Sequence, residues 1–424
     1  MLASFPPTRP GTRAVVALVR SFHALRPVPE AAAAVAAVPY DVVSRSEAFD
    51  LAAGNSLSFL HVSRAEIDLD PATDAYDEAV YHTAARRLEI LRAEAPLVVE
   101  DTASLYFYRL QDGSHEQTGL AGCYSVDEYD RGVIKKHERT RPDKEDDRTR
   151  HLLALGAQSG IVFLTYRAMV DVNAVKTRVC QRDALFDITA SDGVRHTLWR
   201  LTDEEEKAAV EAFAEVPRLY IADGHHRIAS AARARTALAS ASHHDPKVEA
   251  CYFLGVAFPD SETRILPYNR AVADLAGLTS EEFLDAVKTR FPVRPLIEPA
   301  PSKGQISMYL AGRWHDVDLS VDPTLPSRDV VTGLDVARLQ DQIIGPMLQV
   351  ADVRTDPRMI FIGGVRGTGA LKQLVDSGAA AVAFSLAAVT TDELLTVSDA
   401  DAIMPPKSTW FEPKLRDGLL IHLI

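Results

Sequence analysis

The sequence has few cysteines and lacks a long apolar run. Its 424 residues include three cysteines, Cys123, Cys180 and Cys251, and no two of them form a CxxC pair. This spacing argues against a zinc ribbon or a thioredoxin-like redox site and favours reduced, partly buried thiols. No apolar stretch approaches the ~20 residues of a bilayer-spanning helix, and the first residues lack a signal-peptide pattern. We therefore expect a cytoplasmic protein without a membrane partner.

The sequence also lacks an excess of positive charge. Its formal net charge is −13 at pH 7, whereas sequence-independent binding of nucleic acid needs a basic surface. Nucleic acid is therefore not an expected partner, although a small basic site is compatible with this charge. The signatures GxSxG, HExxH, SxxK and the kinase HRD set are absent as well.

The order of apolar and polar residues predicts a mixed α/β fold. Alternation around an Asp-Gly pair predicts a hairpin at 104–126. The other main elements that we expect are strands at 57–63, 161–166, 194–202 and 250–259 and a helix at 71–95. The length suits two or three domains, and we place a boundary near residue 270, between regions 1–270 and 271–424.

A strand–turn–helix junction carries the sequence ADGHHR. Asp223 and Gly224 turn the chain after an apolar strand, and His225, His226 and Arg227 begin an Ala-rich helix. The first turn of a helix has free N–H groups and a positive dipole end, and Arg offers a fork of donors to phosphate. These features favour an anion site made of the five residues. In the alternative interpretation, Asp223 is a simple N-cap and the histidines lie at the surface.

The two adjacent histidines are poor partners for one metal ion. Consecutive side chains on a helix diverge by about 100°, because the helix has 3.6 residues per turn. We therefore expect His225 and His226 to act as hydrogen-bond donors or as acid and base.

A second charged motif, KKHERTRPDKEDDR, precedes another expected helix. Its cations can bind phosphate, and its carboxylates can hold Mg²⁺ or accept a proton. A solvated charged face is the alternative interpretation. The phosphate-binding candidates are Lys135, Lys136, Arg139 and Arg141, and the metal or base candidates are Glu138, Asp143 and Glu145.

Three further segments are weaker candidates. Tyr40 and Asp41 follow a proline, as do Tyr268, Asn269 and Arg270. We assign all five to the lining of the pocket that the two charged motifs would form. The proline-framed MPPKSTWFEPKL, in region 271–424, is compatible with an ordered loop or an irregular edge.

These motifs together resemble the bacterial and archaeal family called domain of unknown function 1015. The resemblance covers essentially the whole chain, and the family name carries no established activity. Gly224-His225-His226-Arg227 is also similar to the G-x-x-R helix start of the ParB/sulfiredoxin superfamily, in which this turn binds nucleotide phosphates. The resemblance implies a ParB/sulfiredoxin-like core with insertions in 1–270 and an additional α/β region in 271–424.

The branches of that superfamily differ in what they imply. His225 stands where sulfiredoxins have a reactive cysteine, and the acidic charge disagrees with the DNA binding of ParB proteins. The free-serine kinases remain, so the likeness implies a nucleotide-dependent phosphotransferase acting on a small hydroxyl substrate such as free serine. ATP, ADP or CTP would be the donor and Mg²⁺ the metal. Catalysis would fall to Glu138, Asp143, His225 and His226.

Two other function classes stay open. One is a nucleotide-binding switch with little turnover, and the other is a metal-dependent hydrolase or nuclease that uses the same carboxylates. The oligomeric state also stays open, and a homo-oligomer is among the expected partners.

Overall fold

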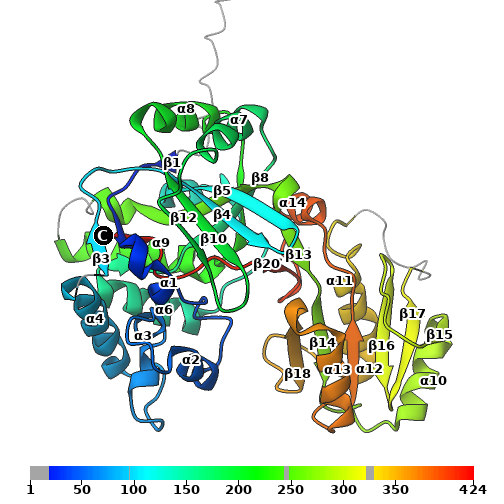
Figure 1. The fold of residues 1–424 in the computed structure, drawn as a ribbon. Coiled ribbons are helices and arrows are strands. Elements are labelled where there is room, and N and C mark those ends of the chain that lie inside the picture. Colours follow the sequence, from blue (N-terminus) through cyan, green and yellow to red (C-terminus); the bar gives the residue numbers. More distant parts are fainter. Residues whose placement is uncertain (1–18, 95, 243–247, 321–328) are drawn as a thin grey trace, which may run out of the picture.

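The computed structural model describes residues 19–94, 96–242, 248–320 and 329–424, which form two lobes (Figure 1). The fold is mixed α/β, as the sequence predicts. No helix within these described ranges is long and apolar enough to cross a membrane.

The first lobe is built on a nine-stranded sheet with the order β6-β11-β8-β12-β5-β4-β10-β9, in which β1 pairs with β5. The strands are β1 (Val19–Arg20), β4 (Tyr106–Asp112), β5 (His115–Ser125), β6 (Ile134–Lys135), β8 (Val162–Tyr166), β9 (Phe186–Thr189), β10 (Arg195–Arg200), β11 (Leu219–Asp223) and β12 (Tyr252–Pro259). β4 and β5 form the predicted hairpin, and the turn residue Gly113 has the positive φ of 58° that glycine tolerates.

Helices pack on both sides of this sheet. α6 contacts both α4 and α9, while α7 and α8 contact each other (Figure 1). The helices of the first lobe are α1 (Ala32–Val35), α2 (Arg45–Ala52), α3 (Leu60–Ser63), α4 (Glu78–Ala93), α5 (Val126–Asp130), α6 (Pro142–Leu155), α7 (Val170–Val179), α8 (Asp203–Phe213) and α9 (His225–Ser242).

The second lobe has its own six-stranded sheet with the order β15-β17-β16-β19-β14-β18. Its strands are β14 (Tyr268–Val272), β15 (Val293–Leu296), β16 (Gln305–Leu310), β17 (Arg313–Asp318), β18 (Met359–Gly363) and β19 (Val382–Ser385). Its helices are α10 (Ser280–Arg290), α11 (Asp335–Leu339), α12 (Gly345–Leu348) and α13 (Gly367–Asp376), with a π-helical stretch at Gln340–Ile344 between α11 and α12.

The chain passes between the lobes twice. It enters the second lobe after β13 (Arg264–Leu266) and returns through β20 (Trp410–Glu412), and these two strands pair antiparallel (Figure 1). The returning segment ends in β21 (Ile421–Leu423), which lies in a small sheet of the first lobe with the order β3-β2-β21-β7. The other strands of this sheet are β2 (Ala24–Pro27), β3 (Leu97–Val99) and β7 (Ala157–Gln158).

The expected division at residue 270 therefore needs a correction. The boundary coincides with β14, but region 271–424 is not one unit, because β21 belongs to a sheet of the first lobe. Sequence pattern gave no sign of this return, since pairing between distant strands leaves no local signature.

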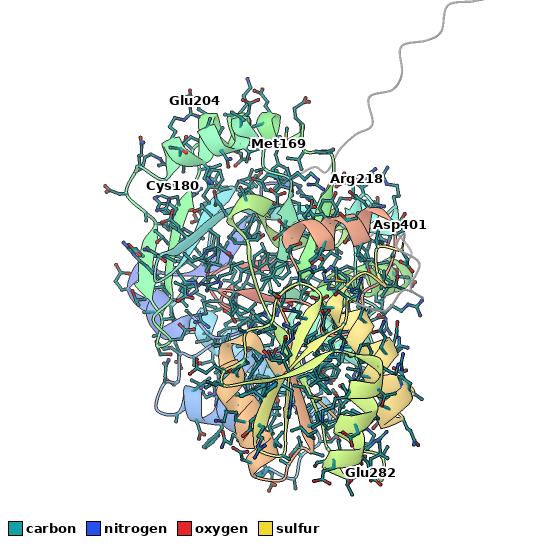
Figure 2. The ribbon with its side chains drawn as sticks, turned by 90° about the vertical axis from the view of Figure 1, so that its right-hand side faces the viewer. Met169, Cys180, Glu204, Arg218, Glu282 and Asp401 are labelled. Carbon is teal, nitrogen blue, oxygen red and sulfur yellow. The ribbon has the colours of Figure 1, made fainter. Side chains whose placement is uncertain are left out.

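Ion pairs fasten α14 (Thr391–Asp399) and the residues after it to the first lobe. Arg218 Nη1 lies 2.8 Å from Asp399 Oδ1, and Lys135 Nζ lies 2.6 Å from Asp401 Oδ1. Figure 2 shows Arg218 and Asp401 at the same edge of the molecule, far from Glu282 of α10. The lobes are thus joined by polar contacts as well as by the two chain crossings.

Two local predictions differ from the structure. Residues 57–63 were expected as a strand, but they contain α3, in which Leu60 and Val62 are buried. A short apolar run fits a buried strand and a buried helical turn equally well. The helix expected at 71–95 begins only at Glu78, where Asp77 accepts a hydrogen bond from the Ala79 amide and caps α4.

Candidate functional site

The two charged motifs meet at the ends of neighbouring parallel strands. β6 and β11 pair through Ile134 with Leu219, so the segments that follow both strands leave the sheet at one edge. His137 follows β6 and His225 follows β11, and their ring centroids are 4.5 Å apart with an interplanar angle of 88°. The structure therefore brings the two charged motifs together.

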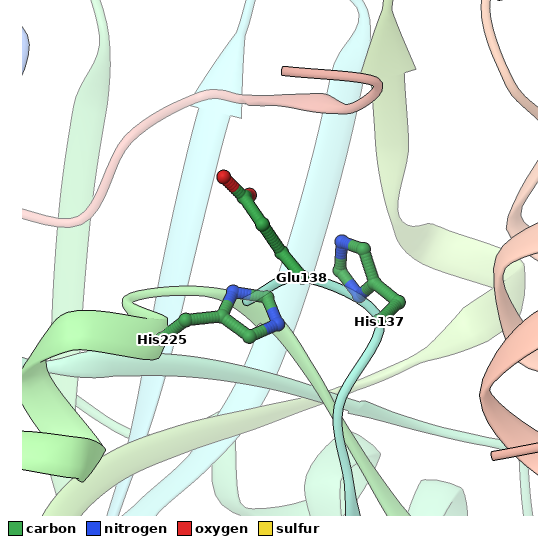
Figure 3. Close-up of side chains that lie close together, drawn as sticks. All are labelled: His137, Glu138 and His225. Carbon is green, nitrogen blue, oxygen red and sulfur yellow. The ribbon is translucent and has the colours of Figure 1, made fainter. Parts of the chain in front are cut away.

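His137, Glu138 and His225 form a compact cluster at this edge (Figure 3). One nitrogen of each imidazole and one carboxylate oxygen of Glu138 lie within 4.8 Å of one another. The two histidines are 1% and 7% exposed, and Glu138 is partly buried. Sequence reasoning missed His137 as a site residue, although it sits in the motif beside Glu138.

Two nitrogen atoms of the cluster are buried without a hydrogen-bond partner. They are His137 Nδ1 and His225 Nε2, while His137 Nε2 lies 3.2 Å from the Thr409 hydroxyl. A buried polar atom without a partner costs about 1–3 kcal/mol, so such atoms are rare and call for an explanation. A bound ligand or cation at this cluster would satisfy them.

Burial sets the protonation of the cluster. It lowers the pKa of His137 to about 4 and that of His225 well below its usual value. Burial raises the pKa of Glu138, and the charge of Lys407 partly offsets this rise. At neutral pH both imidazoles are therefore uncharged, the form that accepts a proton or a metal ion.

Gly224 and Asp223 shape the turn between β11 and α9. Gly224 has φ of 95°, and an added Cβ would lie 3.2 Å from Arg227 Cδ. Asp223 accepts hydrogen bonds from the Gly224 amide at 2.8 Å and from Lys414 Nζ at 2.7 Å. Although burial alone would raise it, Lys414 and then Arg227 hold the pKa of Asp223 below its usual range.

The first turn of α9 keeps free donors. Among the described residues, no acceptor contacts the amides of His225 and His226, whereas the Gly224 carbonyl already accepts from the amides of Arg227 and Ile228. The positive end of the helix therefore presents two backbone N–H groups beside the cluster. This arrangement is compatible with the expected anion site.

Arg227 is placed differently from the sequence expectation. Its side chain is 7% exposed, with Nη1 donating to the Ile161 carbonyl at 2.7 Å and Nη2 to both carboxylate oxygens of Asp41 at 2.9 and 3.0 Å. Its guanidinium also lies 5.5 Å from the Tyr40 ring. These contacts correct the expectation of a phosphate-binding fork, because its terminal nitrogens are already engaged. Arg227 holds the turn against Asp41.

Several residues of the charged motif bind one another. Arg141 Nη2 lies 2.9 Å from Asp143 Oδ2 at the surface, and the Arg141 amide donates to His226 Nε2 at 3.0 Å. Glu145 accepts from the Thr140 hydroxyl and lies 3.4 Å from Arg233 Nη1. The expected metal set of Glu138, Asp143 and Glu145 is corrected accordingly, because only Glu138 lies in the His137–His225 cluster.

The expected phosphate-binding cations also separate. Lys135 pairs with Asp401, and the Lys136 ammonium lies 5.5 Å from the Tyr129 ring. Arg139 lines a groove of about 510 Å³ together with Glu138. The groove runs between the lobes, since its other walls come from residues 331–354 of the second lobe and from the segment Ile403, Met404, Pro405 and Pro406.

Two lysines of the MPPKSTWFEPKL segment reach the site instead. Lys414 binds Asp223, and the positive charge of Lys407 offsets part of the rise that burial causes in the pKa of Glu138. Lys407 lies 5.8 Å from the Tyr268 ring. The sequence marked this segment only as an ordered loop or an irregular edge, because nothing local shows which distant residues a lysine will meet.

The remaining pocket candidates have separate roles. Arg270 is buried and donates to the Pro406 carbonyl at 3.0 Å, which fixes the loop that carries Lys407. Asn269 accepts from the Leu386 amide at 3.2 Å within the second lobe. Tyr268 is thus the member of this trio that lies next to Lys407.

A family model described as "Protein of unknown function (DUF1015)" matches residues 19–337. The chain therefore belongs to this family. No curated protein matches the chain significantly.

Solved structures resemble parts of the fold at low identity. A free serine kinase in complex with AMP shares 11% identity over 70% of this chain and 92% of its own, with a TM-score of 0.36. A conserved hypothetical protein from Pyrococcus furiosus shares 11% over 72% and 95%, with a TM-score of 0.36. SbnI with C-terminal truncation from Staphylococcus aureus shares 12% over 70% and 85%, with a TM-score of 0.37. At these TM-scores the likeness assigns neither a ligand nor an activity to this chain.

Proposed function

We propose that this member of the DUF1015 family is a phosphotransferase that moves a phosphoryl group from a nucleotide to a small hydroxyl substrate. One observation carries the proposal. A carboxylate of raised pKa, Glu138, stands beside the open first turn of α9 and close to the charge of Lys407. Phosphoryl transfer depends mostly on positioning and on stabilising charge, and this edge of the sheet has the groups for both.

The nucleotide phosphates bind at the positive end of α9 in this proposal. The amides of His225 and His226 donate to phosphate oxygens, and Lys407 and Arg139 neutralise the charge. Arg227 supports phosphate binding indirectly, because its contacts with Asp41 and Ile161 fix the turn before α9. ATP, ADP and CTP are the donors to test.

The acceptor hydroxyl lies against Glu138. Its oxygen forms a bond to phosphorus, the bond between phosphorus and the bridging oxygen breaks, and the shortened nucleotide leaves with that electron pair. The hydroxyl proton is lost either to the Glu138 carboxylate or to water, the latter when Glu138 holds a cation that acidifies the hydroxyl. Free serine and other hydroxy amino acids fit the proposal as acceptors.

Glu138→Gln tests the proposal, because the amide keeps the size of the side chain and removes its charge. We expect turnover to fall by about 10²–10⁴-fold, the usual contribution of a general acid or base. Nucleotide affinity should change less than turnover, since the phosphates bind to the helix end and to cations. The assay follows acceptor-dependent release of the shortened nucleotide over a panel of hydroxy amino acids.

Asp143→Asn is the matched control. It removes a carboxylate of the same motif that is exposed and bound to Arg141, and its turnover should equal that of the wild type. Wild-type protein that binds no nucleotide would overturn the proposal. Nucleotide binding without acceptor-dependent turnover would identify a switch instead.

A metal-dependent hydrolase is the second candidate, and the His137–Glu138–His225 cluster favours it. Two imidazoles and a carboxylate are also a ligand set of hydrolytic zinc sites. Release of phosphate without any acceptor, at the rate seen with acceptor, would identify the hydrolase.

A further inference from the structure

We propose that His137, Glu138 and His225 bind one divalent transition-metal ion, for which Zn²⁺ is the probe. The role that we give the ion rests on the proposed function, but its binding does not. The proposal starts from the three side chains that Figure 3 shows close together. They follow the ends of β6 and β11.

The distances suit a metal ion after a small adjustment. Zn²⁺ has ligands at about 2.0–2.1 Å, so two ligands of a tetrahedral site are about 3.4 Å apart. The three potential ligand atoms lie within 4.8 Å of one another. Binding the ion would therefore draw these atoms together by up to roughly 1.4 Å, by the same ligand distances.

The unpaired nitrogens give an independent reason for a ligand here. His137 Nδ1 and His225 Nε2 are both buried without a partner, and the two imidazoles lie edge to face with their centroids 4.5 Å apart. His196, another buried histidine, uses both nitrogens, with the Tyr108 hydroxyl at 3.0 Å and Arg416 Nε at 3.2 Å. The buried His422 leaves Nδ1 unpaired, but among the described histidines only in the His137–His225 pair do two such nitrogens belong to adjacent rings. Within the described ranges, only the His137–Glu138–His225 cluster brings three potential metal ligands together.

The surroundings of His137 fit a metal ligand. Its Nε2 lies 3.2 Å from the Thr409 hydroxyl, which fixes the ring, while Nδ1 has no hydrogen-bond partner. Histidines that bind metals usually hold their second nitrogen through such a hydrogen bond.

The donor atoms select the type of metal. Imidazole nitrogen suits Zn²⁺ and its transition-metal neighbours, whereas Mg²⁺ and Ca²⁺ prefer oxygen ligands. A second carboxylate from Asp143 or Glu145 would favour Mg²⁺, but these residues are bound to Arg141, Thr140 and Arg233. The site therefore does not fit the Mg²⁺ that the sequence led us to expect.

A bound ion determines whether Glu138 acts as a metal ligand or as the base that accepts the proton. Three protein ligands leave one position of a tetrahedral zinc site open, as in catalytic sites. In the proposed phosphotransferase the acceptor hydroxyl takes that position, and its bound oxygen loses its proton to water more readily. Glu138 then holds the metal and does not itself accept the proton.

The test is a titration of chelator-treated, full-length protein with Zn²⁺ against a competing chromophoric chelator, without nucleotide. We expect one Zn²⁺ per chain, checked by elemental analysis. His225→Ala and Glu138→Gln should each weaken binding by at least about 100-fold. Thr409→Val should weaken it by about 10–100-fold, the usual effect of removing an outer hydrogen bond. Asp143→Asn should bind as the wild type does.

Circular dichroism of the metal-free variants checks that each is folded. If His225→Ala is not folded, Glu138→Gln is the decisive variant. Absence of Zn²⁺ binding, or binding that neither variant weakens, would overturn the inference. Zinc binding without nucleotide turnover would keep the inference and remove the proposed function. Turnover that is unchanged in metal-free protein would keep the phosphotransferase, with Glu138 as the base, and overturn the role of the ion.

Discussion

Replacing Arg227 by methionine should destabilise the first lobe, because Arg227 supports the turn between β11 and α9 and does not itself bind the nucleotide phosphates. Methionine keeps most of the length of the side chain and removes the guanidinium. The change leaves the Ile161 carbonyl without its 2.7 Å donor and Asp41 without its partner.

The size of the effect follows from how well each partner can be rehydrated. Breaking a buried ion pair costs about 3–5 kcal/mol, because a charge stays buried without compensation. The Asp41 side chain is 36% exposed, so water can replace part of the lost contact, while the Ile161 carbonyl is buried with its residue. We therefore take the lower end and expect a loss of about 3 kcal/mol.

Hydrogen exchange read by mass spectrometry, in peptides from α9 and β8, measures this local loss. A loss of about 3 kcal/mol corresponds to roughly 100-fold faster exchange, since about 1.4 kcal/mol is a factor of ten. Arg233→Met is the control on the same helix. The Arg233 side chain is 42% exposed and its pairs with Glu145 and Asp146 lie at the surface, so we expect a change below about 1 kcal/mol.

Asp41→Asn in the Arg227→Met background should cost little beyond the single change, because the two residues act as one pair. The reasoning would be refuted if Arg227→Met exchanged like the wild type and bound nucleotide at least tenfold more weakly. Arg227 would then face the ligand.

Two further predictions concern the segment that returns to the first lobe. Burial raises the pKa of Asp417 to about 7, above the ~3.9 of an unfolded chain, so between these values the unfolding free energy falls as pH rises. Asp417→Asn should flatten the thermal midpoint over pH 4–7, and an unchanged slope would contradict the assignment. Gly418→Ala should cost more than Gly113→Ala, because both have positive φ but only the Gly418 Cβ would meet Phe59, at 2.8 Å. Thermal unfolding compares them, with about 1–2 kcal/mol expected for Gly113→Ala, and equal losses would argue against the clash.

Local chemistry predicted much of the first lobe. The β4–β5 hairpin follows from alternation around Asp112 and Gly113, and β11, the turn and α9 follow from an apolar run, Gly224 and an Ala-rich run. The sequence also identified the two motifs as candidate parts of the site, because each places charged residues and histidines beside the start of an expected helix. The parallel pairing of β6 and β11 is what brings the two motifs together.

The partners of individual side chains could not be predicted. Arg227 looks like a phosphate ligand in sequence because its partner, Asp41, lies 186 residues away. Asp143 looks like a metal ligand until Arg141 is seen to bind it. Lys407 and Lys414 reach the site only because the chain returns from the second lobe, and this is a property of topology that no window of sequence contains.

The position of β21 between β2 and β7 has a consequence for how the protein is made. The second-lobe sheet, β14 to β19, comes from one continuous stretch and can fold as soon as that stretch has left the ribosome. The first lobe cannot complete its small sheet until residues 421–423 are synthesised, because β21 joins strands that are more than 100 residues apart. Until then β2 and β7 expose unpaired edges, which are sites of aggregation. A nascent chain stalled before residue 421 should therefore need a chaperone, although most of its sequence is already present.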